Sequence, residues 1–315
     1  MAKAKKKVCL LVASSLPGLD SDQIENWINH MPELKIIADI EPVFVLSKPS
    51  VNVAAATWLS LAQQIKKGYS RYDGFVILHG VTGLLFTGSA LSFMLGNLNK
   101  PVVITGSQSA DELAARHAKN TYGVKANVIN AVQVAVSDLS EVAVMFGNRL
   151  LRVNQSTAAN DESLNVFNAS DSAVLGRIDF SIRIFDKKVK KAASKLSVAE
   201  KLQTNIEVVY LEPLVDISGI AARVPNRSAI LVNAGAAPAL PEDLSFIFEK
   251  IGSTVPVVVW STTITELPYA PKNLLLVNAM TWPATMTKLM WALPQATTID
   301  QLKKIMARSV AKELL

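Results

Sequence analysis

Cysteine and histidine are the scarcest chemical groups in this chain of 315 residues, which holds one cysteine and three histidines. A single cysteine excludes a disulfide within the chain and any metal site built on several thiolates. Cys9 lies in an apolar run, where we expect a small buried side chain. The three histidines (His30, His79 and His117) follow no metal-ligand spacing, and neither common phosphate-binding glycine motif occurs. We therefore expect no metal, no cofactor and a reducing, cytoplasmic setting.

Charged residues are also few, at 18% of the chain, and the basic excess is confined to two stretches. The formal net charge is +6. Nine lysines lie near the start of the chain or in the segment 186–195: Lys3, Lys5, Lys6, Lys7, Lys187, Lys188, Lys190, Lys191 and Lys195. The rest of the chain is close to neutral. Nucleic-acid binding needs basic residues gathered on a folded face, so we expect no nucleic-acid partner.

Apolar segments long enough to cross a membrane are missing as well. Residues 74–98 carry no formal charge, but glycines interrupt them and their first half is β-rich. This pattern predicts a strand, a tight turn and a buried helix rather than a membrane span. The apolar run at 8–13 is too short for a secretory signal and predicts a first buried strand. No membrane partner is expected.

Hydrophobic residues are abundant and make up half of the chain. Their spacing changes along the sequence between that of strands and that of helices. Short β-rich runs alternate with stretches of helical spacing, which predicts a parallel sheet covered on both faces. Strands are expected at residues 8–12, 42–46, 75–78, 102–105, 141–146, 208–211, 228–232, 255–260 and 274–277. Helices are expected from Asp20 onward and at residues 54–67, 86–98, 127–136, 214–224, 241–251, 284–293 and 299–312.

The basic stretch at 186–195 reads DKKVKKAASK, and its charge and low complexity are typical of a linker between domains. We predict an α/β fold of two domains. A larger N-terminal domain at 1–185 has a doubly wound, mostly parallel sheet. A basic linker follows at 186–200, and a smaller C-terminal α/β domain occupies 201–315.

Three segments carry longer motifs. Residues 72–108 read YDGFVILHGVTGLLFTGSALSFMLGNLNKPVVITGSQ, residues 148–152 read NRLLR, and residues 279–293 read AMTWPATMTKLMWAL. Together they resemble the bacterial-type L-asparaginase family, in which the first strand of these segments is followed by H-G-T-D-T and the last segment reads A-D-M-T-x-E-A-x-x-T-K-L. Trp282 and Pro283 depart from that last pattern. The resemblance spans nearly the whole chain and implies the two-domain fold that the periodicity also predicts.

The resemblance implies amide hydrolysis. A threonine hydroxyl attacks the side-chain amide of asparagine or glutamine, and a second threonine, an aspartate and a lysine handle the protons. In this chain the four positions hold residues that cannot perform these tasks, in the same order: Leu16, Val81, Thr82 and Ala158. No intact catalytic residue is therefore expected. Ser14 and Ser15 are the nearest replacement hydroxyls, although both belong to a Ser-rich turn after a strand.

Several binding features have counterparts in the family. Ser50 lies eight residues before Trp58, the spacing of the serine that holds a substrate carboxylate in the family, and a solvated loop serine is the alternative. The segment Gly80, Val81, Thr82 and Gly83 follows a strand and can offer backbone N–H groups to an anion. At His79 we expect a buried, hydrogen-bonded core histidine rather than a catalytic one.

The leading hypothesis is a pseudoenzyme of the hydrolase family, without ordinary catalysis, that binds a small carboxylate or amino acid. Two alternatives stay open. One is an active asparaginase or glutaminase that uses Ser14, Ser15 or a partner subunit, and the other is a structural subunit that assembles with an active paralogue. Family members pair so that one C-terminal domain closes another's site, which implies a homo-oligomer, either a dimer or a tetramer. Pro17 should stiffen the loop 16–20, which in the family is a mobile lid.

Overall fold

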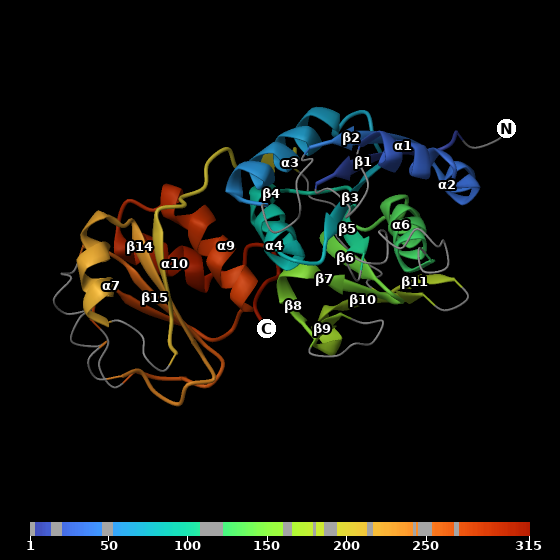
Figure 1. Cartoon of the computed structure of the whole chain (residues 1–315). Coiled ribbons are helices and arrows are strands. Elements are labelled where there is room, and N and C mark those ends of the chain that lie inside the picture. Colours follow the sequence, from blue (N-terminus) through green and yellow to red (C-terminus); the bar gives the residue numbers. More distant parts are fainter. Residues whose placement is uncertain are drawn as a thin grey trace. The chain divides into compact units, whose positions relative to one another are not determined.

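The computed structural model describes residues 4–13, 21–45, 53–107, 122–159, 166–178, 181–185, 194–212, 217–241, 244, 254–267 and 271–315. The chain divides into two compact units, Met1–Glu200 and Lys201–Leu315 (Figure 1). Each unit has a hydrophobic core of its own.

An eight-stranded sheet forms the centre of the first unit, in the order β11-β10-β7-β6-β5-β3-β1-β2. Its strands are β1 (Lys7–Val12), β2 (Asp39–Phe44), β3 (Gly74–Gly80), β5 (Val102–Ser107), β6 (Val142–Phe146), β7 (Arg149–Arg152), β10 (Val174–Ile178) and β11 (Ile182–Ile184). Five neighbouring strands pair in parallel, in the sheet order β2, β1, β3, β5 and β6. The strands β7, β10 and β11 continue the sheet with antiparallel pairing. The predicted mostly parallel sheet is confirmed, and the antiparallel edge is an addition that the sequence did not predict.

Helices cover both faces of this sheet. On one face, α1 (Ser21–Asn29), α2 (Pro32–Ile37) and α6 (Tyr122–Ala135) share a buried core with alternate strand residues such as Val76. The neighbouring residue Phe75 points to the other face, where it packs against Tyr69 and Tyr72 at the end of α3 (Ala55–Gly68). There α3 contacts α4 (Leu84–Met94), which is buried along nearly its whole length. Burial on all sides explains why α4 has no charged residue.

Smaller elements complete the first unit. The strand β4 (Leu95–Gly96) pairs with β12 (Ser197–Val198), and β8 (Ser156–Ala158) pairs with β9 (Phe167–Ala169). Two 3-10 helices are η2 (Val153–Gln155) and η3 (Asp171–Ala173). Of the linker expected at 186–200, residues 186–193 lie outside the described residues.

The second unit is built on four parallel strands in sequence order: β13 (Ile206–Tyr210), β14 (Ala229–Gly235), β15 (Val257–Ser261) and β16 (Leu274–Val277). One face packs on α7 (Ile217–Arg223) and η4 (Val224–Asn226) through a core that includes Val209, Val232 and Val259. The chain continues after β16 with α9 (Trp282–Ala292), η5 (Leu293–Gln295) and α10 (Ile299–Ala307). Trp282 at the start of α9 packs against the rings of Tyr210 and Trp260 on the other sheet face. The helix expected at 241–251 lies almost entirely outside the described residues.

Two helices end earlier than their apolar period predicts. The helix expected at 86–98 begins at Leu84 and ends at Met94, since Leu95 leaves helical dihedral angles and Asn97 has a φ of 58°. The helix expected at 299–312 ends at Ala307, and Arg308 is extended with a φ of −83° and a ψ of 135°. The strand expected at 42–46 is β2, which begins three residues earlier because its parallel pairing with β1 starts at Asp39.

No helix in the described part of the chain has the length and apolar composition that a bilayer span requires. The segment 74–98 instead forms β3, a turn and α4, as its pattern predicted.

Candidate functional site

The carboxyl ends of the central parallel strands meet at one edge of the first sheet. Parallel pairing sets Val12 of β1 beside Leu78 of β3, and it sets His79 and Gly80 of β3 beside Gly106 and Ser107 of β5. The N–H of Ala13 extends the first pairing by donating to the carbonyl of Leu78 at 2.9 Å. In open α/β sheets this edge is where ligands bind, so the candidate site is built on it.

Close backbone contact between β3 and β5 requires a glycine at this edge. A Cβ atom added at Gly106 would lie 1.7 Å from the carbonyl oxygen of His79. No side chain fits in that space, so the residue at 106 must be glycine if β5 is to stay against the end of β3.

The segment Gly80–Gly83 forms the turn between β3 and α4. Val81 is half-buried and Thr82 is exposed. Gly83 has a φ of 76°, a left-handed conformation that glycine adopts without strain, and the Leu84 N–H donates to the carbonyl of Val81 at 3.2 Å. Gly83 is the N-cap of α4 and has no side chain to satisfy the first N–H groups of the helix. A helix start without a side-chain cap is the kind of place at which backbone N–H groups meet anions in proteins.

A buried chain of hydrogen bonds fixes His79 at the start of this turn. The indole Nε1–H of Trp58 donates to Thr87 Oγ1 at 2.9 Å, and the Thr87 hydroxyl donates in turn to His79 Nε2 at 2.9 Å. Because Nε2 accepts, Nδ1 carries the proton and donates to the carbonyl of Gly80 at 2.6 Å. Burial lowers the pKa of His79 from 6.5 to about 4, so the ring is neutral at pH 7. The predicted buried, hydrogen-bonded histidine is confirmed.

Ala158 lies apart from this turn in sequence, on the hairpin of β8 and β9. Its backbone pairs with Phe167, and its side chain is exposed. The preceding helix η2 packs on α4, where Val153 leaves no room for a side chain at position 88: a Cβ added at Gly88 would lie 2.3 Å from Val153 Cγ2.

The structure thus brings Gly80, Val81, Thr82 and Gly83 into one turn and sets Ala158 on a separate hairpin. The remaining candidates of the sequence, Ser14, Ser15, Leu16 and Ser50, lie outside the described residues, as does the loop 16–20. Within the described residues, no group of three His, Cys, Asp or Glu side chains could hold a metal ion.

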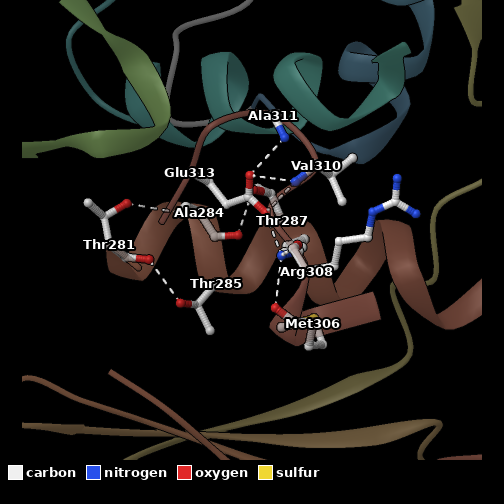
Figure 2. A network of polar contacts seen from close by, with 10 residues as sticks. Thr281, Ala284, Thr285, Thr287, Met306, Arg308, Val310, Ala311 and Glu313 are labelled. Carbon is white, nitrogen blue, oxygen red and sulfur yellow. Dashed lines mark hydrogen bonds and ion pairs between the residues drawn. The ribbon is translucent and has the colours of Figure 1, made fainter. Parts of the chain in front are cut away.

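The second unit contains a buried ion pair that sequence reasoning missed. Lys288 of α9 and Glu313 are both fully buried and form an ion pair. Lys288 Nζ also donates to the carbonyls of Met306 at 2.8 Å and Arg308 at 2.6 Å. The carboxylate of Glu313 accepts from the N–H groups of Val310 at 3.0 Å and Ala311 at 2.7 Å (Figure 2).

These contacts satisfy both charges inside the unit. Burial lowers the pKa of Lys288, and the hydrogen bond and charge of Glu313 oppose that shift. The amine is held by three oxygens and is not available for chemistry. One signal could have indicated the pair: Lys288 is the single charged residue between Asn278 and Ile299. A lone charge in a buried helix requires a partner.

Comparisons with known proteins agree with this architecture. The family model described as "Asparaginase, N-terminal" matches residues 12–190. L-asparaginase 1 of Escherichia coli (strain K12) is 32% identical over 282 residues, which cover 84% of this chain and 81% of that protein. The L-asparaginase of Thermococcus kodakarensis is 25% identical over 294 residues, which cover 88% of this chain and 87% of that protein.

The solved structures give the same result at the level of the fold. The crystal structure of L-asparaginase I from Vibrio cholerae superposes with a TM-score of 0.82 at 25% sequence identity, covering 99% of this chain and 100% of that one. The resemblance and the two-domain α/β fold predicted from the sequence are confirmed. The motifs, the matched family model and the whole-chain relatives agree, and the chain belongs to the asparaginase family.

Proposed function

We propose that this member of the asparaginase family does not hydrolyse amides by the ordinary route of the family and instead binds a small carboxylate at the strand-end turn. The observation that carries the proposal is the chemistry of four substituted positions: Leu16, Val81, Thr82 and Ala158. None of these side chains offers a carboxylate or an amine. Only Thr82 keeps a hydroxyl.

Amide hydrolysis by a hydroxyl needs a base to take its proton and an acid to return a proton to the leaving amine. Thr82 cannot act as a carboxylate, and Ala158 has no group that titrates. His79 is the nearest described titratable side chain along the chain, but hydrogen bonds to Thr87 and Gly80 occupy both of its nitrogens. When such a unit of nucleophile and base is removed, only the residual rate from binding and electrostatics is left.

The turn itself still suits an anion. Gly83 begins α4 without a side-chain cap, so N–H groups at the start of the helix can meet a ligand oxygen. With Thr82 in place of the aspartate, an amino acid's ammonium loses the carboxylate that would pair with it. These features support a simple carboxylate as ligand in preference to a zwitterionic amino acid.

The test combines turnover and binding in the purified protein. We expect no ammonia release from asparagine or glutamine above the buffer blank. Succinate should raise the melting temperature, because a ligand that binds only the folded state stabilises it, and asparagine should not. Turnover at an ordinary enzymatic rate, about 1–1000 per second, would contradict the proposal.

Two variants separate the proposal from its alternatives. Thr82→Asp changes an exposed side chain and should reverse the preference, weakening succinate and admitting asparagine. If the protein does release ammonia, the double variant Ser14→Ala, Ser15→Ala decides whether a displaced serine is responsible. Turnover that appears only with an active paralogue present would support the structural-subunit hypothesis.

A further inference from the structure

A pocket in the second unit has the size and charge of a ligand site. Its volume is about 390 Å³, and it lies at the amino ends of β14 and β15, next to η5 and the start of α10. Small-molecule sites commonly begin at about 300 Å³. Ser228 precedes β14 and Thr254 precedes β15, so the pocket is built on the opposite strand ends from those that form ligand sites in open sheets.

The charge at the pocket comes from Arg227, which lines it. Arg227 and Arg223 share one buried carboxylate: their Nε atoms lie 3.1 Å and 2.6 Å from the two oxygens of Glu207. Arg227 Nη1 donates to Asn205 Oδ1 at 2.9 Å. Its other terminal nitrogen, Nη2, has no hydrogen-bond partner among the described residues. Two cations on one carboxylate leave an excess positive charge beside the cavity.

The rest of the lining is polar at one side and apolar at the other. Ser228 and Thr254 supply hydroxyl groups, while Pro256, Leu293 and Leu302 supply an apolar wall. No acidic side chain is among the described residues that line the pocket. An anion with a hydrocarbon part would therefore meet a guanidinium and an apolar surface, whereas an ammonium group would find no carboxylate.

The side chains at the start of α10 are already engaged with one another and with the N–H of Gln301. Thr298 Oγ1 accepts from the N–H of Gln301 at 3.2 Å. The side-chain oxygen of Gln301 accepts from both the N–H and the hydroxyl of Thr297, at 2.9 Å and 2.8 Å. This leaves Arg227 as the charged partner in the pocket.

We infer that this pocket binds a small aliphatic carboxylate, with its carboxyl group on Arg227 and its chain against Pro256, Leu293 and Leu302. The inference concerns a second site and does not depend on the proposed function of the strand-end turn. A guanidinium is the appropriate group, since it offers paired donors in the geometry of a carboxylate.

The experiment is calorimetric titration of the full chain with hexanoate, and with hexanamide as the neutral molecule of the same shape. Hexanoate should bind, and hexanamide should bind at least about tenfold more weakly, because it lacks the charge-assisted hydrogen bonds. Norleucine, which adds an α-ammonium to the same chain, should also bind more weakly. Equal affinity for hexanoate and hexanamide, tighter binding of inorganic phosphate, or no hexanoate binding at millimolar concentration would overturn the inference.

Three variants locate the binding. Arg227→Gln should lower hexanoate affinity by about tenfold or more. Thr254→Trp keeps Arg227 and places a large ring over the pocket from an exposed position, so it should also abolish binding. This variant tests the pocket without removing the ion pair between Arg227 and Glu207. Lys304→Gln, which removes an exposed cation of α10 that does not line the pocket, should leave hexanoate affinity unchanged. Unaltered affinity in Arg227→Gln, or an equal loss in Lys304→Gln, would contradict the assignment.

Discussion

A neutral histidine at the end of β3 controls the backbone of the candidate turn. His79 donates to the carbonyl of the next residue, Gly80, and is itself held by Thr87 and Trp58. The sequence predicted that His79 is buried, since it stands at the end of an apolar strand. It could not predict its partners, because Trp58 and Thr87 are 29 residues apart and meet only where α3 packs on α4.

This burial makes stability depend on pH in a defined window. The pKa of His79 is about 4 in the folded chain and 6.5 when unperturbed, so the unfolded chain binds more protons between these values. The free energy of unfolding should therefore be full above pH 6.5 and should fall by about 3 kcal/mol as the pH drops to 4. The measurement is urea unfolding across this range, comparing the parent chain with His79→Gln.

The difference in the free energy of unfolding between the parent chain and His79→Gln isolates the effect of His79 from that of carboxylates that titrate in the same pH range. It should shrink as the pH falls, because the glutamine variant has no imidazole at this position to protonate. A constant difference between parent and His79→Gln across the window would contradict the prediction.

At the same scale, Lys288 and Glu313 depend on each other. Replacing one partner leaves the other as an unpaired buried charge, which commonly costs about 3–5 kcal/mol. Lys288→Met should therefore lower the free energy of unfolding by that amount in urea denaturation. Lys304→Met, on the exposed side of α10, is the matched control and should change it by less than about 0.5 kcal/mol.

The double variant Lys288→Met, Glu313→Leu tests the physical reason. It removes both charges, so it should recover much of the stability that Lys288→Met loses. If Lys288→Met is as stable as the parent chain, the ion pair does not stabilise the packing of the C-terminal residues.

At the scale of elements, the sequence predicted the buried strands well and the short polar ones poorly. Apolar runs predicted β1, β3, β5, β6 and β16 to within two residues at each end. The strand β7 lies between β6 and β10 and reads RLLR, and its arginines make it resemble a surface loop. In the structure Arg152 pairs with Glu141, the residue before β6, at 2.9 Å, a contact that local sequence does not show.

The start of α10 was predicted correctly at Ile299, where Thr298 caps the helix. The helix expected from Ala284 begins two residues earlier at Trp282, because Thr281 caps α9 by accepting from the N–H of Ala284 at 3.3 Å. Helix ends were less predictable. The end of α10 lies where Lys288 Nζ donates hydrogen bonds to the carbonyls of Met306 and Arg308. That contact joins residues about 20 positions apart.

The two caps give a paired prediction. Thr281→Ala should cost more than Thr298→Ala, because Thr281 is buried and its loss leaves an N–H in the interior, whereas water can replace the exposed Thr298. We expect about 2 kcal/mol for the first and below about 1 kcal/mol for the second in chemical denaturation. Serine in place of Thr281 keeps the acceptor and should restore most of the loss. Equal costs at both caps would contradict this reasoning.

At the scale of the whole molecule, the α/β class followed from the alternating period, and the division into a larger and a smaller part followed from the basic, low-complexity stretch at 186–195. The candidate site was less accessible to sequence reasoning. The position of the turn at the end of β3 was predictable from topology, since parallel strands gather their carboxyl ends. The glycine requirement at Gly106 was not, because it arises from the approach of a neighbouring strand.

The last prediction concerns assembly. Soluble proteins that oligomerise mostly form closed symmetric assemblies, and the family resemblance implies pairing in which one protomer completes the site of another. We therefore expect a dimer or a dimer of dimers, with a mass of two or four times the protomer's 34.0 kDa in light scattering at micromolar concentration. We expect the assembly to form whichever residue stands at position 82, because Thr82 is a single exposed side chain in a turn. The variant Thr82→Asp should consequently leave the measured mass unchanged, and a strictly monomeric species in the parent chain would contradict the prediction.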